Sequence, residues 1–383
     1  MRFRRGSTDV FDRDDALGGE PVGNIVVDHC SCSWGFDENL SLYRHIYNGQ
    51  DGKGDQKLPV VNLTVQWCIS SEALDTHNHA FGGTWGGRND TFHHNLFACN
   101  TGRNPSIGMG FDFNFINNVV FNWRHRTTDG GDWTTRGNLI NNYYKPGPIS
   151  AGALRYRVVK AEGRSPTKGA PPEYGKWYVS GNFIEGHPEL SGDNWAIEKD
   201  GASAVQFDPK AGNNGESTDV LKSPEKIKEM MEMVRSKEQF PMPPVNIQTP
   251  EAAYNLILAD VGATLPKRDP VDFRIIEEVR TGKVAYPEGK GIITDISQVG
   301  GRPDYQGDPV LDSDHDGIPN WWEVKYGLNP NDASDAVKDL TGDGYSNIEK
   351  YINGLDPTKK IDFKDLKNNV NTLTPYVFMA PAK

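Results

Sequence analysis

The sequence predicts an all-β protein built as a parallel β-solenoid, with a few peripheral helices and a small calcium-binding appendage near its C-terminal end. Three observations predict this class. The chain of 383 residues has 41 glycines and only 36% hydrophobic residues, which favours many short strands joined by turns over a helical protein. Short apolar runs recur in the first half, with asparagine at a fixed place. After about residue 185 this rhythm stops, and helix and metal-binding patterns follow.

The repeated asparagines define the coils of the predicted solenoid. They recur at intervals of 23, 24 and 40 residues, as Asn95, Asn118, Asn142 and Asn182. One coil takes on the order of 20 to 30 residues, so the longest interval implies a loop that bulges from its coil. Stacked asparagines bond to one another and to turn backbone, which ties successive coils together. The alternative is that the asparagines mark separate hairpins of a β-sandwich.

Composition and charge restrict the function. The net charge of -11 disfavours a nucleic-acid partner, because binding phosphates needs surplus positive charge, and an acidic ligand would need a bridging cation. The sequence has no run of about 18 apolar residues, and its first residues lack the apolar core of a signal peptide. We expect that coils preceding these first residues are missing. Cys30 and Cys68 occupy matching places in two similar segments, which indicates stacked thiols or, alternatively, a disulfide.

Two segments of the second half carry helix start signals. Ser223 and Thr249 are each followed directly by a proline, which places a capping side chain just before the first helical position. A proline-rich connector separates the two segments. We therefore expect two helices that pack against the side or the end of the solenoid.

The stretch DSDHDGIPNWWE matches a calcium loop of the EF-hand type without a gap. Calcium takes about six to eight hard oxygen ligands, and Gly317 at loop position 6 lets the backbone turn sharply around the ion. The predicted ligands at the remaining motif positions are Asp312, Asp314, Asp316, the backbone carbonyl of Ile318, Asn320 and Glu323. A metal enclosed by protein oxygens in this way is expected to be structural.

A second stretch, DLTGDGYSNIEK, is a weaker match to the same motif. Its oxygen ligands at the corresponding positions are Asp339, Thr341, Asp343 and Tyr345. The glutamate of this stretch, Glu349, stands at position 11, and Lys350 occupies position 12, where the motif has its bidentate carboxylate. A second calcium site and a loop without metal both remain open. Together the two loops resemble the paired calcium-binding repeats appended to secreted bacterial polysaccharide enzymes.

Five segments together resemble the pectate lyase family of polysaccharide lyases, in particular its Bacteroidetes-like branch. They are NIVVDHCSCSWGFDENLSLY, NLTVQWCISS, HAFGGTWGG, FHHNLFACNTGRNP and NNYYKPGP, and the likeness spans about residues 12–285. The resemblance implies a right-handed parallel β-helix with a sugar-binding cleft on one sheet. It also implies cleavage of polygalacturonate by β-elimination, in which an arginine takes the proton from carbon 5 of the sugar.

The family's Arg-x-Pro-x-x-Arg pattern gives that role to Arg103. The stretch RNPSIG matches the first arginine and the proline, but Gly108 stands where the family has the second arginine, which binds the substrate carboxylate. The expected substitutes are Arg88, Arg124 and Arg126. Because free arginine has a pKa of about 12.5 or above, we expect calcium and neighbouring cations to lower the pKa of Arg103, and the pH optimum to be alkaline. No carboxylate stands near Arg103 in the sequence, which indicates the substrate as its partner.

The resemblance further implies a calcium ion between the enzyme and the uronate. Asp37 matches the first aspartate of the family's Asp-x-x-x-Asp pair. The second aspartate falls on Ser41, a poorer ligand, and the neighbouring Glu38 is expected to compensate. Asp15, or alternatively Asp14, matches the aspartate that the family places upstream.

Two further side chains are candidates for sugar binding. The family's substrate-binding lysine has no clear match, and Asn78 or His79 stands in its place. Trp85, in the glycine-rich stretch GGTWGGR, is a candidate for stacking on a sugar ring, because an aromatic face packs well on a pyranose. Packing between coils is the alternative for this tryptophan.

The whole chain is therefore expected to be a secreted, calcium-dependent pectate lyase, a monomer that acts on polygalacturonate or a related acidic polysaccharide. One alternative is a catalytically weak β-helical polysaccharide-binding protein, which the missing second arginine and Ser41 favour. Another is a hydrolase, for which the pair Asp37 and Glu38 alone does not supply the acid and the base. The expected parts are a β-helical catalytic domain over 1–215, a helical and loop segment packed on it over 216–300, and calcium-binding repeats over 301–383.

Overall fold

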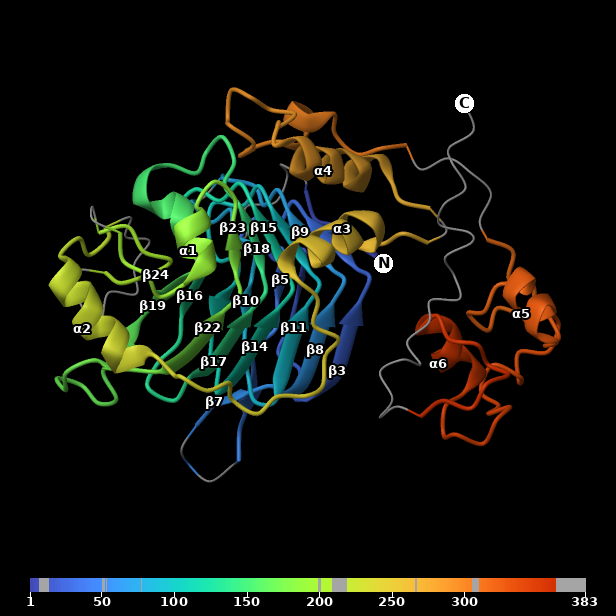
Figure 1. Ribbon diagram of the computed structural model, residues 1–383. Coiled ribbons are helices and arrows are strands. Elements are labelled where there is room, and N and C mark those ends of the chain that lie inside the picture. The colour runs from blue at the N-terminus through green and yellow to red at the C-terminus, as the bar shows by residue number, and fades with distance from the viewer. Residues whose placement is uncertain are drawn as a thin grey trace. The chain divides into compact units, whose positions relative to one another are not determined.

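The computed structural model describes residues 1–6, 14–49, 52, 54–76, 78–198, 201–208, 219–265, 267–304 and 310–362. The chain forms two compact units, one of residues 1–263 and 269–303, the other of residues 264–268 and 304–383. The first unit holds the repeated strands and the second holds both predicted calcium loops (Figure 1). Among the described helices, none has the length and apolar character needed to cross a membrane.

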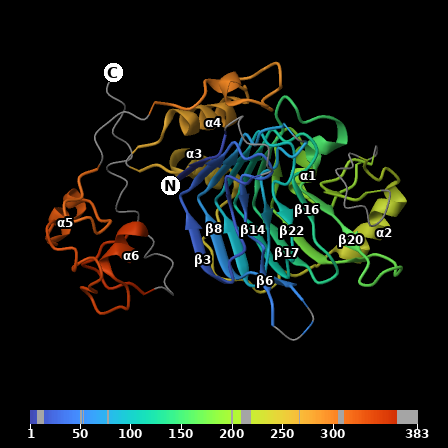
Figure 2. The ribbon, with the colours of Figure 1, turned by 180° about the vertical axis from the view of Figure 1, so that it is seen from behind.

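The first unit is a parallel β-helix in which each complete coil gives one short strand to each of three sheets. Figure 2 shows the first sheet from behind. Its strands are, in order, β3 (Gly23–Asp28), β8 (Val61–Gln66), β11 (Asp90–His93), β14 (Asp112–Ile116), β17 (Arg136–Ile140) and β22 (Lys176–Ser180). The second sheet consists of β1 (Arg2–Arg4), β4 (Ser31–Ser33), β9 (Ile69–Ser71), β12 (Leu96–Ala98), β15 (Val119–Phe121), β18 (Tyr143–Lys145) and β23 (Phe183–Ile184).

The third sheet has the shortest strands and carries the cleft described below. Its strands are β10 (Thr84–Trp85), β13 (Ser106–Ile107), β16 (Thr128–Gly130), β19 (Val159–Ala161) and β24 (Val205–Gln206). A parallel bridge between Leu42 and Trp85 continues it into the pair β2 (Leu17–Gly18) and β5 (Leu40–Ser41). Two hairpins leave the coils, formed by β6 (Arg44–Tyr47) with β7 (Gln56–Pro59) and by β20 (Gly163–Arg164) with β21 (Glu173–Tyr174). The predicted all-β solenoid is confirmed, and the sandwich alternative is wrong.

The asparagine repeat forms the expected ladder inside the coils. Asn95 Nδ2 donates to Asn118 Oδ1 at 3.0 Å, Asn118 Nδ2 to Asn142 Oδ1 at 3.1 Å, and Asn142 Nδ2 to Asn182 Oδ1 at 2.8 Å. Each Oδ1 of this ladder also accepts the backbone N–H of the preceding coil, as Asn118 does for Asn95 at 2.9 Å. All four side chains are buried, so the ladder replaces water as their hydrogen-bond partner. Toward the N-terminus the stack continues with the thiols of Cys68 and Cys30, and all four cysteines are free and buried.

Helices cover the second sheet of the β-helix (Figure 1). The cluster that joins them to this sheet contains Ile257, Leu258, Ile275 and Val279 from the helices and Leu96, Val119 and Phe121 from the strands. The main helices of the first unit are α1 (Pro188–Gly192), α2 (Pro224–Val234), α3 (Pro250–Asp260) and α4 (Pro270–Thr281). The side chains of Ser223 and Thr249 cap α2 and α3, which confirms both helix start signals. Short 3-10 helices lie at Gly152–Tyr156 and Ile296–Val299.

The second unit contains two short helices, α5 (Asn320–Tyr326) and α6 (Asn347–Ile352). Its core is small: Ile318, Trp322 and Ala336 are buried, and Ile348 and Tyr351 pack against them. A core of this size supplies little stability by itself, so units of this kind commonly depend on metal ions or other cross-links.

Candidate functional site

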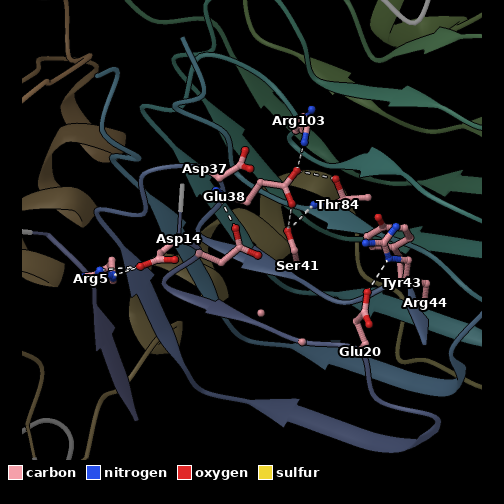
Figure 3. A pocket seen from close by; sticks show the side chains of 13 residues that line it. Arg5, Asp14, Glu20, Asp37, Glu38, Ser41, Tyr43, Arg44, Thr84 and Arg103 are labelled. Carbon is pink, nitrogen blue, oxygen red and sulfur yellow. Dashed lines mark hydrogen bonds and ion pairs between the residues drawn. The ribbon is translucent and has the colours of Figure 1, made fainter. Parts of the chain in front are cut away.

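A polar cleft of about 590 Å³ lies beside β2, β5 and β10 (Figure 3). Successive coils contribute to it because β5 pairs with β2 and bridges to β10. Acidic and cationic side chains dominate the lining, which consists of Arg5, Asp14, Asp15, Gly18, Gly19, Glu20, Asp37, Glu38, Ser41, Tyr43, Arg44, Thr84 and Arg103. The structure therefore brings together Arg103 and three of the predicted metal ligands of the β-helix, Asp15, Asp37 and Glu38.

Arg103 forms an ion pair with Glu38 in this cleft (Figure 3). Its guanidinium carbon also lies 4.3 Å from the centre of the Phe81 ring, a cation–π arrangement. The Arg103 side chain is 26% exposed, whereas that of Glu38 is 8% exposed, so the guanidinium remains open to a ligand in the cleft. The expectation that Arg103 lacks an acidic partner within the protein is wrong, because folding brings Glu38 to it from another coil.

The Glu38 carboxylate is fully engaged. Besides Arg103, it accepts a hydrogen bond from Thr84 Oγ1 at 2.6 Å and another from the hydroxyl of Ser41. Ser41, the residue in place of the family's second aspartate, thus acts here as a donor to Glu38. Arg103, Thr84 and Ser41 thus supply three donors to this buried carboxylate.

The electrostatics of Arg103 also differ from the expectation. Burial lowers the pKa of its guanidinium, but the charge and the hydrogen bond of Glu38 outweigh burial, so the pKa lies above its usual value. The predicted lowering by neighbouring cations is therefore wrong for this arrangement. Arg103 is a firm cation as long as it remains paired with Glu38.

Three carboxylates crowd this end of the cleft. Burial, followed by the charges of Glu38 and Asp37, raises the pKa of Asp15 to about 7. Asp15 Oδ1 accepts the Glu38 backbone N–H at 3.1 Å, and Asp37 Oδ1 lies 2.5 Å from His79 Nδ1. A divalent cation suits this excess of negative charge. The oxygens of the three carboxylates do not all lie within 4.8 Å of one another, so a shared ion requires their rearrangement.

The surroundings of Gly108 explain why the second arginine of the family pattern is missing here. A Cβ atom at this position would lie 2.5 Å from Cδ2 of the Tyr43 ring and 2.9 Å from Cγ2 of Thr84. No side chain of arginine size fits beside Tyr43, which itself lines the cleft. The tyrosine therefore takes the space that the family gives to arginine.

The predicted arginine substitutes lie elsewhere. The Arg124 guanidinium pairs with Asp75, and the Arg88 guanidinium lies 4.8 Å from the centre of the Phe111 ring. Arg126 is buried and bonds to Asp129 at 3.0 Å. None of the three lines the cleft. Among the residues that the structure describes, the cations that join Arg103 there are Arg5, paired with Asp14, and Arg44, paired with Glu20, and the sequence motifs had pointed to neither.

Trp85 is a core residue and not a sugar-binding platform. It is 1% exposed, its indole Nε1 donates to the backbone O of Leu40 at 2.8 Å, and its ring stacks on Phe92 with centroids 5.0 Å apart. Neighbouring residues of a strand point to opposite faces, so Thr84 faces the cleft while Trp85 enters the coil. The stacking prediction is therefore wrong, and the packing alternative holds.

The first predicted calcium loop has the oxygens that a metal needs. Ligand oxygens of Asp312, Asp314 and Asp316 lie within 4.8 Å of one another. Both oxygens of Asp314 and both oxygens of Glu323 are buried without a hydrogen-bond partner, and the whole Glu323 residue is 0% exposed. Burial, followed by the charges of Asp314 and Asp316, raises the pKa of Glu323 to about 7. Anionic oxygens left without donors in this way fit a bound cation.

Two carboxylates of this loop, Asp312 and Asp316, also accept hydrogen bonds from backbone N–H groups of the loop. Asp312 accepts the N–H of His315 at 2.8 Å and of Gly317 at 3.1 Å, and Asp316 accepts the N–H of Ile318 at 2.7 Å. The side chain of Asn320 bonds to Ser313 through both its oxygen and its nitrogen, each at 2.8 Å, so it is engaged outside the carboxylate cluster. A role for the Ile318 carbonyl stays a prediction.

The second predicted calcium loop contains a side-chain cation. Lys350 Nζ lies 2.8 Å from Asp343 Oδ2 and donates to Thr341 Oγ1 at 2.6 Å, and the ammonium side chain is 0% exposed. Asp339 is satisfied by backbone N–H groups, including that of Gly344 at 2.7 Å. Two of the predicted ligands thus bind the ammonium group, and the structure favours the loop without metal. Tyr345 donates its backbone N–H to Asp343.

The chain is similar to fungal proteins that carry the name probable pectate lyase C. A probable pectate lyase C from Aspergillus fumigatus is 30% identical over 370 residues, which are 94% of this chain and 71% of that protein. A probable pectate lyase C from Aspergillus flavus is 28% identical over 366 residues, with the same coverage of both chains. No family model matches the chain.

Two solved structures resemble the chain more distantly. A thermostable pectate lyase is 15% identical with a TM-score of 0.33, and the cedar-pollen allergen Jun a 1 is 15% identical with a TM-score of 0.32. Each match covers 65% of this chain, which spans 54% and 56% of the two solved chains.

Proposed function

Because the chain belongs to the pectate lyase family of polysaccharide lyases, we propose that it cleaves polygalacturonate by β-elimination, with Arg103 as the group that takes the proton from carbon 5. The observation that carries this proposal is the convergence of Arg103 with Asp15, Asp37 and Glu38 in one open, polar cleft. The proteins named pectate lyase C supply the reaction class, and the cleft supplies the residues.

The chemistry explains why such a cleft needs cations. The proton on carbon 5 is adjacent to a carboxylate, so its removal builds up negative charge beside an existing one. Cationic groups near that carboxylate stabilise the enolate-like transition state. In the proposed step, Arg103 takes the proton, the electron pair forms the double bond between carbons 4 and 5, and the bond from carbon 4 to the glycosidic oxygen breaks. That oxygen leaves with a proton from water in the cleft.

Arg103 has to part from Glu38 before it acts as a base. While the two are paired, the guanidinium keeps its proton, because the charge of Glu38 raises its pKa. The Glu38 carboxylate can bind either the guanidinium or another cation, and it binds the guanidinium in this structure. We therefore propose that the productive complex differs at this contact, and that activity rises toward alkaline pH, where a released arginine loses its proton more readily.

Calcium is part of the proposal. Asp15, Asp37 and Glu38 would hold the ion, since these three carboxylates crowd one end of the cleft. When bound, calcium would neutralise the substrate carboxylate and act as a Lewis acid toward it. The chain's own cations, Arg5 and Arg44, lie in the same lining and would bind further uronates along the polymer. Since the polymer is extracellular, we also propose that the protein is secreted.

One observation favours the weaker alternative, a polysaccharide-binding protein. Tyr43 fills the space of the second arginine, and Arg88 and Arg124 do not reach the cleft, so the described part of the chain gives the cleft fewer cations than the family pattern implies. A binding protein would retain Arg5 and Arg44 as its contacts. It would not release product.

The test follows the product of the reaction. Polygalacturonate is incubated with the full chain in calcium and in a chelator, and both the ultraviolet absorbance of the unsaturated uronide and the number of new reducing ends are measured. A lyase increases both in calcium and neither in chelator. A hydrolase creates reducing ends without the ultraviolet absorbance. A binding protein migrates more slowly through a gel that contains polygalacturonate and creates neither reducing ends nor absorbance. Each of these two results would overturn the proposal.

A further inference from the structure

The second unit contains a carboxylate that the calcium-loop motif does not include. Asp335 lies 12 residues after Glu323, outside the loop that starts at Asp312. Ligand oxygens of Asp316, Glu323 and Asp335 nevertheless lie within 4.8 Å of one another. This second cluster shares only Asp316 with the cluster of Asp312, Asp314 and Asp316.

Four oxygens of this second cluster are buried and lack donors. Glu323 is 0% exposed and Asp335 is 6% exposed. Both oxygens of Glu323, Oδ1 of Asp335 and Oδ2 of Asp316 have no hydrogen-bond partner. Among the described residues, no lysine or arginine forms an ion pair with Asp312, Asp314, Asp316, Glu323 or Asp335. Buried carboxylates without donors or counter-ions are unstable, so a cation is expected at this second cluster.

We propose that the second unit binds two divalent cations side by side, with calcium as the natural choice. One is held by Asp312, Asp314 and Asp316, and the other by Asp316, Glu323 and Asp335, so that Asp316 bridges them. The distances between the ligand atoms favour two ions over one. Calcium–oxygen distances of about 2.3–2.6 Å require the ligand atoms of one ion to lie within about 5 Å of each other. The described carboxylates meet that limit as two clusters and not as one.

Asp335 is held in place for this role by its backbone and by its other oxygen. Its Oδ2 accepts the N–H of Asn329 at 2.8 Å, and its backbone O accepts Asn347 Nδ2 at 2.8 Å. Only Oδ1 remains free to bind a metal. The second ion therefore links three parts of the unit: the loop, α5 through Glu323, and the segment before α6.

The second loop shows what the same scaffold does without metal. Lys350 stands 11 residues after Asp339, as Glu323 stands 11 residues after Asp312, so the two occupy the same loop position. One loop presents a carboxylate there, and the other an ammonium group that binds Asp343 directly. The pairing of Asp343 with a cation shows that this loop geometry accommodates positive charge beside the aspartate at loop position 5. This comparison does not depend on the lyase activity.

The experiment counts calcium bound by the full chain after removal of metal with a chelator and equilibration at fixed free Ca²⁺. Asp335→Asn preserves an oxygen that accepts the Asn329 N–H, and Asp312→Asn removes a ligand of the other cluster only. Each is expected to bind one ion fewer than the wild type, and the double variant two fewer. Asp332→Asn, the same change at an exposed carboxylate of the same turn, is the control and is expected to retain the full count.

The proposal would be overturned if Asp335→Asn bound as many calcium ions as the wild type. It would also be overturned if the double variant lost only one ion, the same ion that each single variant loses. A second measurement needs no variant. Tb³⁺ replaces calcium, and its luminescence is sensitised by Trp322, which packs with Ile318 beside the loop. The wild-type chain is expected to show two sensitised ions in the titration, and one sensitised ion would also overturn the proposal.

Discussion

The guanidinium of Arg103 binds the carboxylate of Glu38, although 65 positions separate the two residues in the chain. The contact forms because the coils stack: parallel bridges link Glu38 to Phe81 and Phe81 to Gly102, so Arg103 reaches Glu38 across the intervening coil. It keeps Arg103 protonated and at the same time binds the carboxylate that the proposed calcium site needs. The proposed reaction therefore begins with an exchange of partners at Glu38.

The space beside Gly108 predicts the effect of restoring the family's arginine. Gly108→Arg is expected to destabilise the β-helix by about 1–3 kcal/mol, because its side chain overlaps Tyr43. Adding Tyr43→Ala is expected to recover most of that loss and to lower KM for polygalacturonate relative to Tyr43→Ala alone. Urea unfolding and initial rates measure the two effects. A double variant no more stable than Gly108→Arg would contradict this explanation.

The asparagine ladder is expected to contribute strongly to stability. Asn118→Ala removes the acceptor of the Asn95 backbone N–H and of Asn95 Nδ2, and one donor to Asn142 Oδ1, so unfolding in urea should show a loss of about 2–4 kcal/mol. An exposed asparagine ladder on the same β-helix provides the control. Asn62 Nδ2 donates to Asn24 Oδ1 at 2.8 Å in that ladder, and Asn62→Gly, which suits the φ of 56° at this position, should lose no more than about 0.5–1 kcal/mol. Equal losses would show that burial does not decide the contribution.

Acid is expected to weaken the β-helix through two buried histidines. Burial, with the neighbouring His94 as a further cause, lowers the pKa of His93 to about 3, and burial lowers the pKa of His94 to about 4. The unfolded chain binds protons near pH 6.5 while the folded chain does not, so this contribution is complete above that pH and declines as the pH falls toward 3. In His93→Gln, the free energy of unfolding should fall less steeply between pH 6.5 and 4. An identical slope would contradict the assignment.

Lys350 is expected to be the reason why the second loop needs no metal. Although burial acts in the opposite direction, the bond from Lys350 holds the pKa of Asp343 well below its usual range. Lys350→Glu recreates the carboxylate that the first loop has at this position. The variant should unfold more readily in chelator, by about 3–5 kcal/mol as for a broken buried ion pair, and should be rescued by calcium more than the wild type is. Absence of this added calcium dependence would contradict the interpretation.

Local sequence signals predicted the repeated parts of the fold well. The regular interval between the asparagines marked the coils. The capping residues Ser223 and Thr249, each followed by a proline, marked the starts of α2 and α3. The same signal was present at Asp269, which caps α4 before Pro270, and was overlooked. These features were readable because each depends on neighbours in the sequence or on a regular interval.

The parts of the site that were missed depend on contacts between coils. The strand β10 has only two residues, so the sequence does not show which of Thr84 and Trp85 faces the core. The pairing of Glu38 with Arg103 and the approach of Asp335 to Glu323 follow from stacking and packing that no local motif encodes. Tyr43 lies in a different coil from Gly108, so its effect on the family pattern was equally hidden.

The central claim is tested most directly by turnover of polygalacturonate in Arg103→Lys, followed by the ultraviolet absorbance of the unsaturated product in saturating calcium. Lysine preserves the charge but does not reproduce the planar guanidinium, and we expect kcat to fall by about 10²–10⁴-fold. Arg88→Lys, at an exposed arginine outside the cleft lining, should retain wild-type turnover. If Arg103→Lys also turns over at the wild-type rate, Arg103 does not take the carbon-5 proton.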